Sequence, residues 1–187
     1  MTMTPERLPV VLVLASGRGE RFRASGGAVH KLQALLAGRR VIDRTLDAVR
    51  ASGLPWHVED VGHPGMGDSI AAAVRATADA PGWLVLPADL PLVLPATLRA
   101  VAEALADCRA AQPVFQGERG HPVGFGAASG PTLMALAGEQ GAAPVLKALR
   151  AGGAARELAV DDAGVVTDID TLDDLTRAES LLRSRGD

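Results

Sequence analysis

The sequence predicts an α/β protein in which a mainly parallel sheet is covered by helices. Short apolar runs alternate along the chain with longer segments of helical periodicity. Several apolar runs end in glycine-rich or acidic turns, which is typical of the carboxyl ends of parallel strands. The 187 residues are 48% hydrophobic, enough for one well-buried core and too few for two. We therefore expect one domain that spans residues 1–187.

The expected elements follow from the length and spacing of these runs. Short apolar runs bounded by turn residues predict strands. They are residues 10–14, 56–61, 83–86, 113–115, 123–125, 157–160 and 165–169. Apolar residues three or four positions apart predict helices. They are residues 41–51, 69–78, 95–110, 131–137, 145–149 and 172–183.

Charge and composition exclude several classes of protein. A net charge of −3 offers no basic surface for nucleic acid, and no apolar window is long enough to cross a membrane. Residues 1–7 lack the apolar core of a signal peptide, so we expect a cytoplasmic protein with no nucleic-acid or membrane partner. Cys108, the one cysteine, continues a helical stripe of apolar residues, which favours a buried inert thiol over a nucleophile.

The first expected strand leads into a glycine-rich turn flanked by cations. The turn runs from Leu14 and Ala15 through Ser16, Gly17 and Gly19 to Arg21, and Lys31 follows. Glycines let backbone N–H groups approach phosphate oxygens closely, and the two cations supply charge that amides lack. This pattern predicts a nucleotide site.

Two related motifs fit this turn less well. A dinucleotide fingerprint needs a third glycine where Phe22 stands and an acidic residue about 20 positions further on. A P-loop needs Gly-Lys-Ser/Thr, whereas Lys31 lies between His30 and Leu32. An ordinary strand-to-loop glycine pair with solvated arginines remains the structural alternative.

Acidic turns follow two other expected strands. Asp89 lies between two prolines after residues 83–86, and Asp168 and Asp170 lie at the end of residues 165–169. Carboxylates at one edge of a sheet suit Mg²⁺, which takes oxygen ligands together with substrate phosphates. Asp89 also has an alternative role in a backbone turn, and Asp170 or Thr171 is a candidate cap for the helix that follows.

Two more turns are expected at the same edge. Gly65, Gly67 and Ser69 offer flexible backbone and a hydroxyl to a base or ribose, although a plain helix cap at Asp68 or Ser69 explains them equally well. His121 opens an expected strand and offers an imidazole to a polar acceptor, or it is a loop histidine with no role.

With its motifs in this order, the chain resembles the molybdenum cofactor cytidylyltransferase and guanylyltransferase group, the MobA-like NTP transferases. The pattern L-A-A-G-x-G-x-R-F/M…K matches residues 14–22 and Lys31, with Ser16 in place of the second alanine. The other matches are Gly65-Met66-Gly67-x-Ser69-Ile70, Asp89-Leu90-Pro91, Gly120-His121-Pro122-Val123, and Asp168-Ile169-Asp170-Thr171 with Asp174-Leu175.

The resemblance implies a Rossmann-like three-layer α/β/α sandwich of the nucleotide-diphospho-sugar-transferase type. It implies transfer of a nucleotide from an NTP, CTP being favoured, to the phosphate of molybdopterin with release of pyrophosphate. By position, Arg21 and Lys31 would bind the triphosphate, and Asp89 and Asp168 would hold Mg²⁺. His121 would contact the pterin acceptor. A transient contact with a molybdoenzyme or its chaperone also follows.

The chain departs from the family pattern in three places. Nine residues, 22–30, separate the signature arginine from the lysine, and we interpret this long loop as a lid over the triphosphate. One strand, rather than two, fits between residues 51 and 65. The arginine of Gly-Asp-x-Gly-Ala-Arg is Ala143 here. A guanylyltransferase, a transferase with another phosphorylated acceptor and a non-catalytic nucleotide- or pterin-binding chaperone therefore remain alternatives.

Overall fold

The computed structural model describes residues 8–186, so residues 1–7, with their expected lack of a signal segment, lie outside the described part. The strands are β1 (Val10–Leu14), β2 (Leu35–Leu36), β3 (Arg39–Arg40), β4 (Trp56–Glu59), β5 (Gly82–Pro87), β6 (Ala110–Phe115), β7 (Glu118–Arg119), β8 (Val123–Gly126) and β9 (Ala155–Ala159). The α-helices are α1 (Glu20–Ala24), α2 (Val41–Ser52), α3 (Met66–Ala76), α4 (Pro95–Ala104), α5 (Gly130–Met134), α6 (Ala143–Ala151) and α7 (Leu172–Ser184). The 3₁₀ helices are η2 (Lys31–Gln33), η3 (Ala127–Ser129) and η4 (Ala163–Val166).

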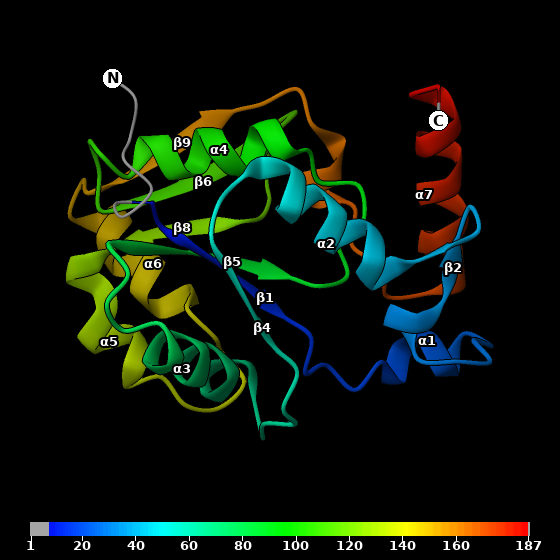
Figure 1. The fold of residues 1–187 in the computed structure, drawn as a ribbon, viewed down its shortest axis with the longest axis horizontal. Helices are drawn as coiled ribbons and strands as arrows, with labels where there is room; N and C mark the ends of the chain where they lie inside the picture. The colour runs from blue at the N-terminus through cyan, green and yellow to red at the C-terminus, as the bar shows by residue number, and fades with distance from the viewer. Residues whose placement is uncertain (1–7, 187) are drawn as a thin grey trace.

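The strands form one main sheet in the order β4-β1-β5-β8-β6-β7, and β9 lies along the other side of β6 (Figure 1). β1 is parallel to β4 and β5, and β6 is parallel to β9. β8 is antiparallel to both of its neighbours, and β7 is antiparallel to β6. The expected mainly parallel sheet is confirmed, with β4 at one edge and β9 at the other.

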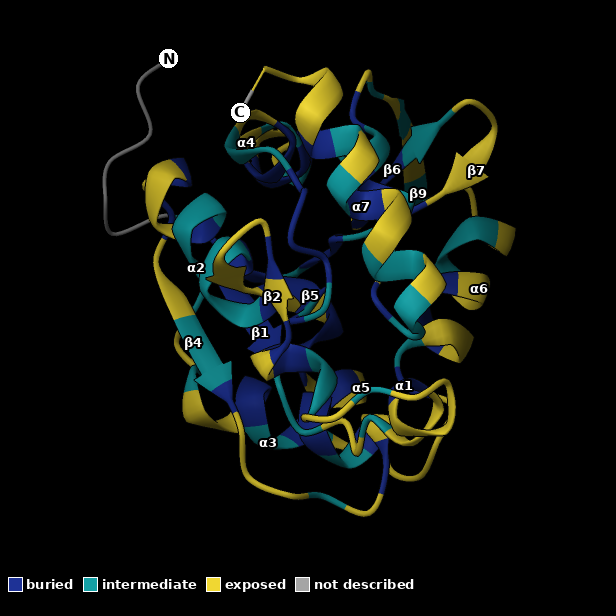
Figure 2. Cartoon of the chain, turned by 90° about the vertical axis from the view of Figure 1, so that its right-hand side faces the viewer, coloured by how far each residue is buried: buried dark blue, intermediate teal, exposed yellow. Residues whose placement is uncertain are grey.

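Helices cover both faces of the sheet, which gives the expected three layers (Figure 1). Alternate residues of β1 face opposite cores: Val11 and Val13 pack with α2, α4 and α7, whereas Leu12 and Leu14 pack with α3, α5 and α6. Each fully buried side chain of this size contributes about 2 kcal/mol by leaving water. Figure 2 shows the central strands as buried and α7 as a helix with exposed residues on its outer side.

The strand expected at residues 165–169 is wrong. This segment consists of the 3₁₀ helix η4 and irregular backbone, although Val165 and Ile169 are buried as a strand pattern requires. Gly164 packs so closely on the Leu92 carbonyl that a Cβ would lie 2.0 Å from its oxygen. The N–H of Ile169 donates to the Asp89 carbonyl at 3.0 Å, so the segment follows a loop and not a strand.

The helix expected at residues 95–110 ends at Ala104, because Ala110 already pairs with both β8 and β9. Cys108 therefore lies in the connection after α4, where its Sγ donates to the Ala104 carbonyl at 3.0 Å. It is half-buried, and burial raises the pKa of its thiol. The inert thiol expected from the sequence agrees with this environment, but its place on a helix does not.

The segment expected as a loop at residues 22–30 begins inside a helix. Phe22 lies in α1 and is 1% exposed, because its ring is part of the core cluster that also contains Val41 and Val49 of α2. Ser25 accepts a hydrogen bond from the Leu172 N–H, which ties this segment to the start of α7. Among residues 8–186, no helix is long and apolar enough to cross a membrane.

Candidate active site

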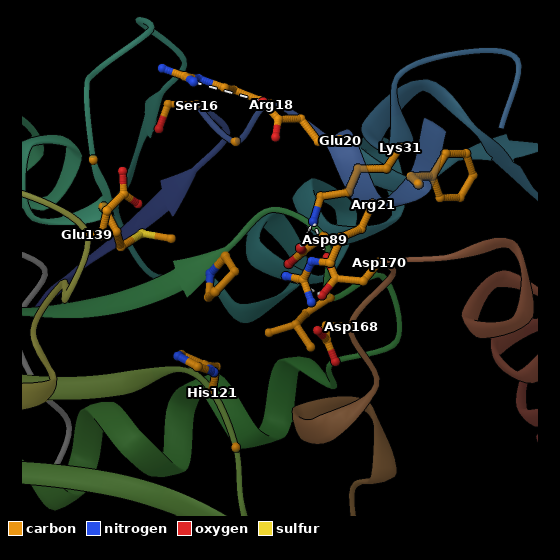
Figure 3. Close-up of a pocket in the computed structure, with 18 of the residues that line it drawn as sticks. Ser16, Arg18, Glu20, Arg21, Lys31, Asp89, His121, Glu139, Asp168 and Asp170 are labelled. Atoms are coloured by element: carbon orange, nitrogen blue, oxygen red, sulfur yellow. Dashed lines mark hydrogen bonds and ion pairs between the residues drawn. The ribbon is translucent and has the colours of Figure 1, made fainter. Parts of the chain in front are cut away.

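A cavity of about 660 Å³ opens at the carboxyl ends of β1 and β5. Its walls come from the glycine-rich turn after β1, the loop before α3, the loop after β5, the β7–β8 connection and the segment before α7. Figure 3 shows Lys31, Asp89 and Asp170 together at one side, with Ser16 and Glu139 at another. The topology thus brings together the turns that the sequence placed at one edge of the sheet.

The glycine-rich turn is held in shape by hydrogen bonds from its surroundings. Ala15 N–H donates to the Glu59 carbonyl at 2.8 Å, and the hydroxyls of Ser16 and Ser69 lie 2.7 Å apart. Gly19 has a φ of 63°, a left-handed conformation that favours glycine. Nothing lies within 4 Å of the position that a Cβ on Gly17 would take, so its backbone is open to the cavity.

Lys31 is the centre of the charged part of the cavity. Its Nζ donates to Asp89 Oδ2 at 2.5 Å and to Asp170 Oδ1 at 2.7 Å, and Arg21 pairs with Asp170 Oδ2 at 2.8 Å. Burial lowers the pKa of Lys31, but the charges and hydrogen bonds of Asp89 and Asp170 outweigh it and raise that pKa above its usual value. Lys31 is therefore a charged, positioned cation.

Asp168 and Asp170 have opposite environments two residues apart. Burial, followed by the charges of Asp170 and Asp89, raises the pKa of Asp168. Burial also opposes ionisation of Asp170, but its contacts with Lys31 and Arg21 lower its pKa below the usual value. Arg21 and Lys31 thus balance the negative charge of Asp170, whereas Asp168 has no cationic partner among the described residues.

The carboxylates fit the Mg²⁺ expected from the sequence. Asp89 Oδ1 is the one buried side-chain oxygen or nitrogen without a hydrogen-bond partner among the described residues. Asp89, Asp168 and Asp170 all line the cavity, and a cation would satisfy Oδ1. No group of three or more His, Cys, Asp or Glu side chains within residues 8–186 forms a metal site alone. Mg²⁺ would accordingly keep waters or phosphate oxygens as further ligands.

The Gly65–Ser69 turn only partly lines the cavity and mainly packs against the neighbouring backbone. A Cβ on Gly65 would lie 2.4 Å from the Gly138 carbonyl carbon, and Gly67 N–H donates to the Gly138 oxygen at 2.7 Å. These glycines permit close backbone contact with the loop before α6. Gly65 lines the cavity, as Ser16, Gly17 and Gly19 do. The remaining expected nucleotide-binding residues lie outside the lining: Leu14, Ala15, Gly67 and Ser69.

Of the expected helix caps near these turns, Thr171 is confirmed, whereas Asp68, Ser69 and Asp170 are not caps. Gly65, not Asp68 or Ser69, precedes the first residue of α3, and Asp68 accepts a hydrogen bond from Gly138 N–H at 2.9 Å. At α7 the cap is Thr171, which forms a capping box with Asp174. The Asp170 side chain therefore does not cap the helix and pairs with Lys31 and Arg21 instead.

His121 lies on the cavity wall opposite Ser16 (Figure 3). The backbone N–H of His121 donates to the Val165 carbonyl at 2.9 Å, and Gly120 permits this approach because a Cβ there would lie 2.4 Å from the same oxygen. Burial lowers the pKa of His121, which makes its imidazole neutral at neutral pH. His121 is thus a neutral imidazole in the lining of the cavity.

Sequence reasoning missed two lining residues with defined partners. Asp170 was only a candidate helix cap beside Thr171, and its signal was the repeated acid in Asp168-Ile169-Asp170. His63 lines the cavity and its Nε2 lies 3.1 Å from Glu59 Oε1. No local motif marks His63, because its partner lies at the end of β4.

Comparisons with known proteins agree with this fold. The family model described as "MobA-like NTP transferase domain" matches residues 47–154, more than half of the chain. That range contains Asp89 but not Arg21, Lys31, Asp168 or Asp170. The comparison with curated protein sequences finds no match.

Solved structures extend the similarity over nearly the whole chain. Rv0371c from Mycobacterium tuberculosis H37Rv is 25% identical, with a TM-score of 0.75, covering 96% of this chain and 100% of that one. A structure of Rv0371c in complex with manganese has a TM-score of 0.72 at 25% identity, covering 93% and 98%. A molybdopterin-guanine dinucleotide biosynthesis protein A from Archaeoglobus fulgidus is 18% identical, with a TM-score of 0.61, covering 94% and 99%, and that likeness shows the fold alone.

Proposed function

Because the chain belongs to the MobA-like NTP transferase family, we propose that it transfers CMP from CTP to the phosphate of molybdopterin and releases pyrophosphate. The observation that carries the proposal is the cavity cluster in which Lys31 pairs with Asp89 and Asp170 and Arg21 pairs with Asp170, with Asp168 in the same lining. Cations for a triphosphate and oxygen ligands for a metal are the two requirements of nucleotidyl transfer. We place both in one domain formed by residues 1–187.

The reaction needs positioned charges more than a nucleophilic side chain. An oxygen of the acceptor phosphate attacks the α-phosphorus of CTP, and the bond from that phosphorus to the bridging oxygen breaks. Pyrophosphate leaves with the electron pair. Lys31 and Arg21 bind the triphosphate oxygens and stabilise the charge that develops on them.

Asp89 and Asp168 hold Mg²⁺ in this proposal, and Asp170 adjoins them. The metal would neutralise phosphate charge, as divalent ions do in phosphoryl transfer. The manganese complex of Rv0371c supports a divalent metal in this fold. Ser16, Gly17, Gly19 and Gly65 contact the nucleotide, and His121 contacts the pterin acceptor.

A different phosphorylated acceptor is the second candidate, favoured by the alanine at position 143. In the family pattern that position carries an arginine, and here Ala143 is exposed at the start of α6, outside the cavity lining. A product containing molybdopterin would pass to a molybdoenzyme or its chaperone through a transient contact.

Pyrophosphate release tests the proposal directly. The purified protein is supplied with Mg²⁺, CTP and molybdopterin, and pyrophosphate is measured against reactions that lack one component. Release that requires all three supports CMP transfer to molybdopterin. Release with another phosphorylated acceptor alone supports the second candidate, and tight nucleotide binding without release identifies a non-catalytic binding protein.

A further inference from the structure

Glu59 holds two imidazoles at the carboxyl end of the edge strand β4. Its Oε1 lies 3.1 Å from Nε2 of His63, and its Oε2 lies 3.4 Å from Nε2 of His57. The Glu59 side chain is only 8% exposed. Burial raises its pKa, but the hydrogen bonds from His63 and His57 outweigh burial and lower that pKa below its ordinary value. Glu59 is therefore an ionised carboxylate at neutral pH.

An ionised carboxylate fixes the proton positions on both histidines. It only accepts hydrogen bonds, so each imidazole must donate through Nε2. In neutral His63, Nδ1 is then left as an acceptor. Nδ1 makes no hydrogen bond with the described residues, and it is not among their buried unpaired atoms, so it is open to a ligand.

His63 differs from His57 in its position. His63 lines the cavity next to Pro64, Gly65 and Met66, and His57 does not. This wall carries no lysine or arginine, and Met66 is 40% exposed, which suits a flat ring. β4 lies on the side of β1 away from β5, whose end carries Asp89. If the triphosphate binds Lys31 as proposed above, a nucleobase on the β4 side of the cavity would lie beside His63.

We propose that His63 determines base specificity by accepting, at Nδ1, a hydrogen bond from the exocyclic amino group of the nucleobase. Glu59 is the positioning residue that keeps the proton on Nε2. The inference rests on the proposed function, because it takes the ligand to be an NTP. Cytosine presents an amino group at its 4-position, whereas uracil presents a carbonyl oxygen whose lone pairs would face those of Nδ1. The site therefore selects CTP over UTP.

Calorimetric titration with CTP and UTP in the presence of Mg²⁺ tests the assignment without an acceptor. We expect the wild-type protein to bind CTP about tenfold more tightly than UTP, the effect of one good hydrogen bond. His63→Phe keeps a ring of similar shape without the acceptor and should reduce this ratio to less than about twofold. His57→Phe is the matched control, since it removes the other imidazole from the same carboxylate outside the cavity, and it should retain the full ratio.

Glu59→Gln tests the positioning role. The amide no longer dictates which nitrogen of His63 carries the proton, so the CTP/UTP ratio should fall. Ring ¹⁵N shifts of His63 should change from a fixed Nε2–H form to a mixture of tautomers. A fixed tautomer in Glu59→Gln together with an unchanged ratio would overturn the role of Glu59.

Either of two results would contradict the assignment of His63. Equal affinity of the wild-type protein for CTP and UTP overturns it, and so does a full ratio in His63→Phe. Pyrophosphate assays separate this failure from failure of the proposed function. Turnover without base selectivity overturns only the His63 assignment, and selective binding without turnover overturns only the transfer reaction. If neither nucleotide binds, both are wrong.

Discussion

Nζ of Lys31 lies 2.5 Å from Oδ2 of Asp89, although 58 positions separate the two residues in the chain. The contact joins the end of the glycine-rich segment to the loop after β5, and Asp170 completes it from the segment before α7. Lys31 and Asp89 are both largely buried, with side chains 12% and 14% exposed. Lys31 uses two of its three N–H donors in these contacts, so a triphosphate would bind the third or replace a carboxylate, and a cation at Asp89 would compensate a carboxylate that is left.

Asp89→Asn should reduce pyrophosphate release by at least about a hundredfold while the protein remains folded. The amide keeps the size of the side chain but loses the negative charge that holds a divalent cation. Circular dichroism should be unchanged, and Mg²⁺ should no longer raise nucleotide affinity. Asp173→Asn, an exposed position in the first turn of α7, is the control. Near-normal Mg²⁺-dependent release by Asp89→Asn would contradict the assignment.

We predict that CTP is used in preference to GTP. The turn at residues 14–17 has alanine where guanylyltransferases of the resembled group tend to carry an additional glycine. Ser16 is held by the Ser69 hydroxyl at 2.7 Å, which keeps this wall in place. Comparison of kcat/KM for the two nucleotides measures the preference, and a clear advantage for GTP would reverse the prediction.

Gly17 and Gly27 should respond differently to alanine. A Cβ on Gly27 would lie 2.3 Å from Cδ1 of buried Phe22 and 2.9 Å from its carbonyl oxygen, so Gly27→Ala should lower the free energy of unfolding by about 1 to 3 kcal/mol. Gly17 has no atom within 4 Å of such a Cβ, so Gly17→Ala should change that free energy by less than about 0.5 kcal/mol.

Gly17→Ala should instead weaken CTP binding, because its methyl group would stand where the backbone approaches the phosphates. Denaturant unfolding and calorimetric titration of both variants measure the two effects. Unchanged CTP affinity in Gly17→Ala would show that this part of the turn is not a phosphate contact.

The sequence was most informative where periodicity and burial agree. The β1 and β5 patterns were confirmed because alternating faces of these strands are buried in two cores. The 165–169 pattern misled because Val165 is buried from the 3₁₀ helix η4 and Ile169 from irregular backbone. This segment is held by contacts with Leu92, Asp89 and His121. Long-range backbone contacts of this kind leave no periodic signal in the sequence.

The candidate site could be predicted only in part for the same reason. Lys31 and Asp89 were identified from turns that follow strands, and the topology explains why those turns meet. Asp170 was considered as a cap beside Thr171 because capping is a local property, whereas its pairing with Arg21 and Lys31 is not. His63 required knowledge of where β4 ends relative to the loop that follows it.

Glu59→Gln should make stability less sensitive to acid. The pKa of Glu59 in the folded protein lies below its ordinary value of 4.5, so ionised Glu59 stabilises the fold above that pH. This contribution is lost as pH falls through the folded pKa. The difference in free energy of unfolding between wild type and Glu59→Gln should therefore shrink from about pH 6 to about pH 3.

Denaturant unfolding at several pH values measures this difference. Glu103→Gln, an exposed position on α4, is the control and should show no such trend. A constant difference between wild type and Glu59→Gln across this range would show that the two histidines do not stabilise the ionised carboxylate.

The segment at residues 22–30 should become ordered when a nucleotide binds. Phe22 anchors its start in the core, and His30 Nε2 donates to the Gly17 carbonyl at 2.7 Å while its Nδ1 accepts from Leu32 N–H. Between these anchors, Ala28 and Val29 are exposed. Local opening of such a segment requires little free energy.

Both ends of the segment adjoin the phosphate-binding cations. When Arg21 and Lys31 bind one triphosphate, their separation becomes fixed, and the intervening residues lose freedom at a modest entropic cost. Closure of the segment would exclude water during transfer. Hydrogen exchange with Mg²⁺ and a non-hydrolysable CTP analogue should therefore show slower exchange at Ala28 and Val29 than in the free protein. Unchanged exchange at saturating ligand would identify the segment as a surface insertion without a role in catalysis.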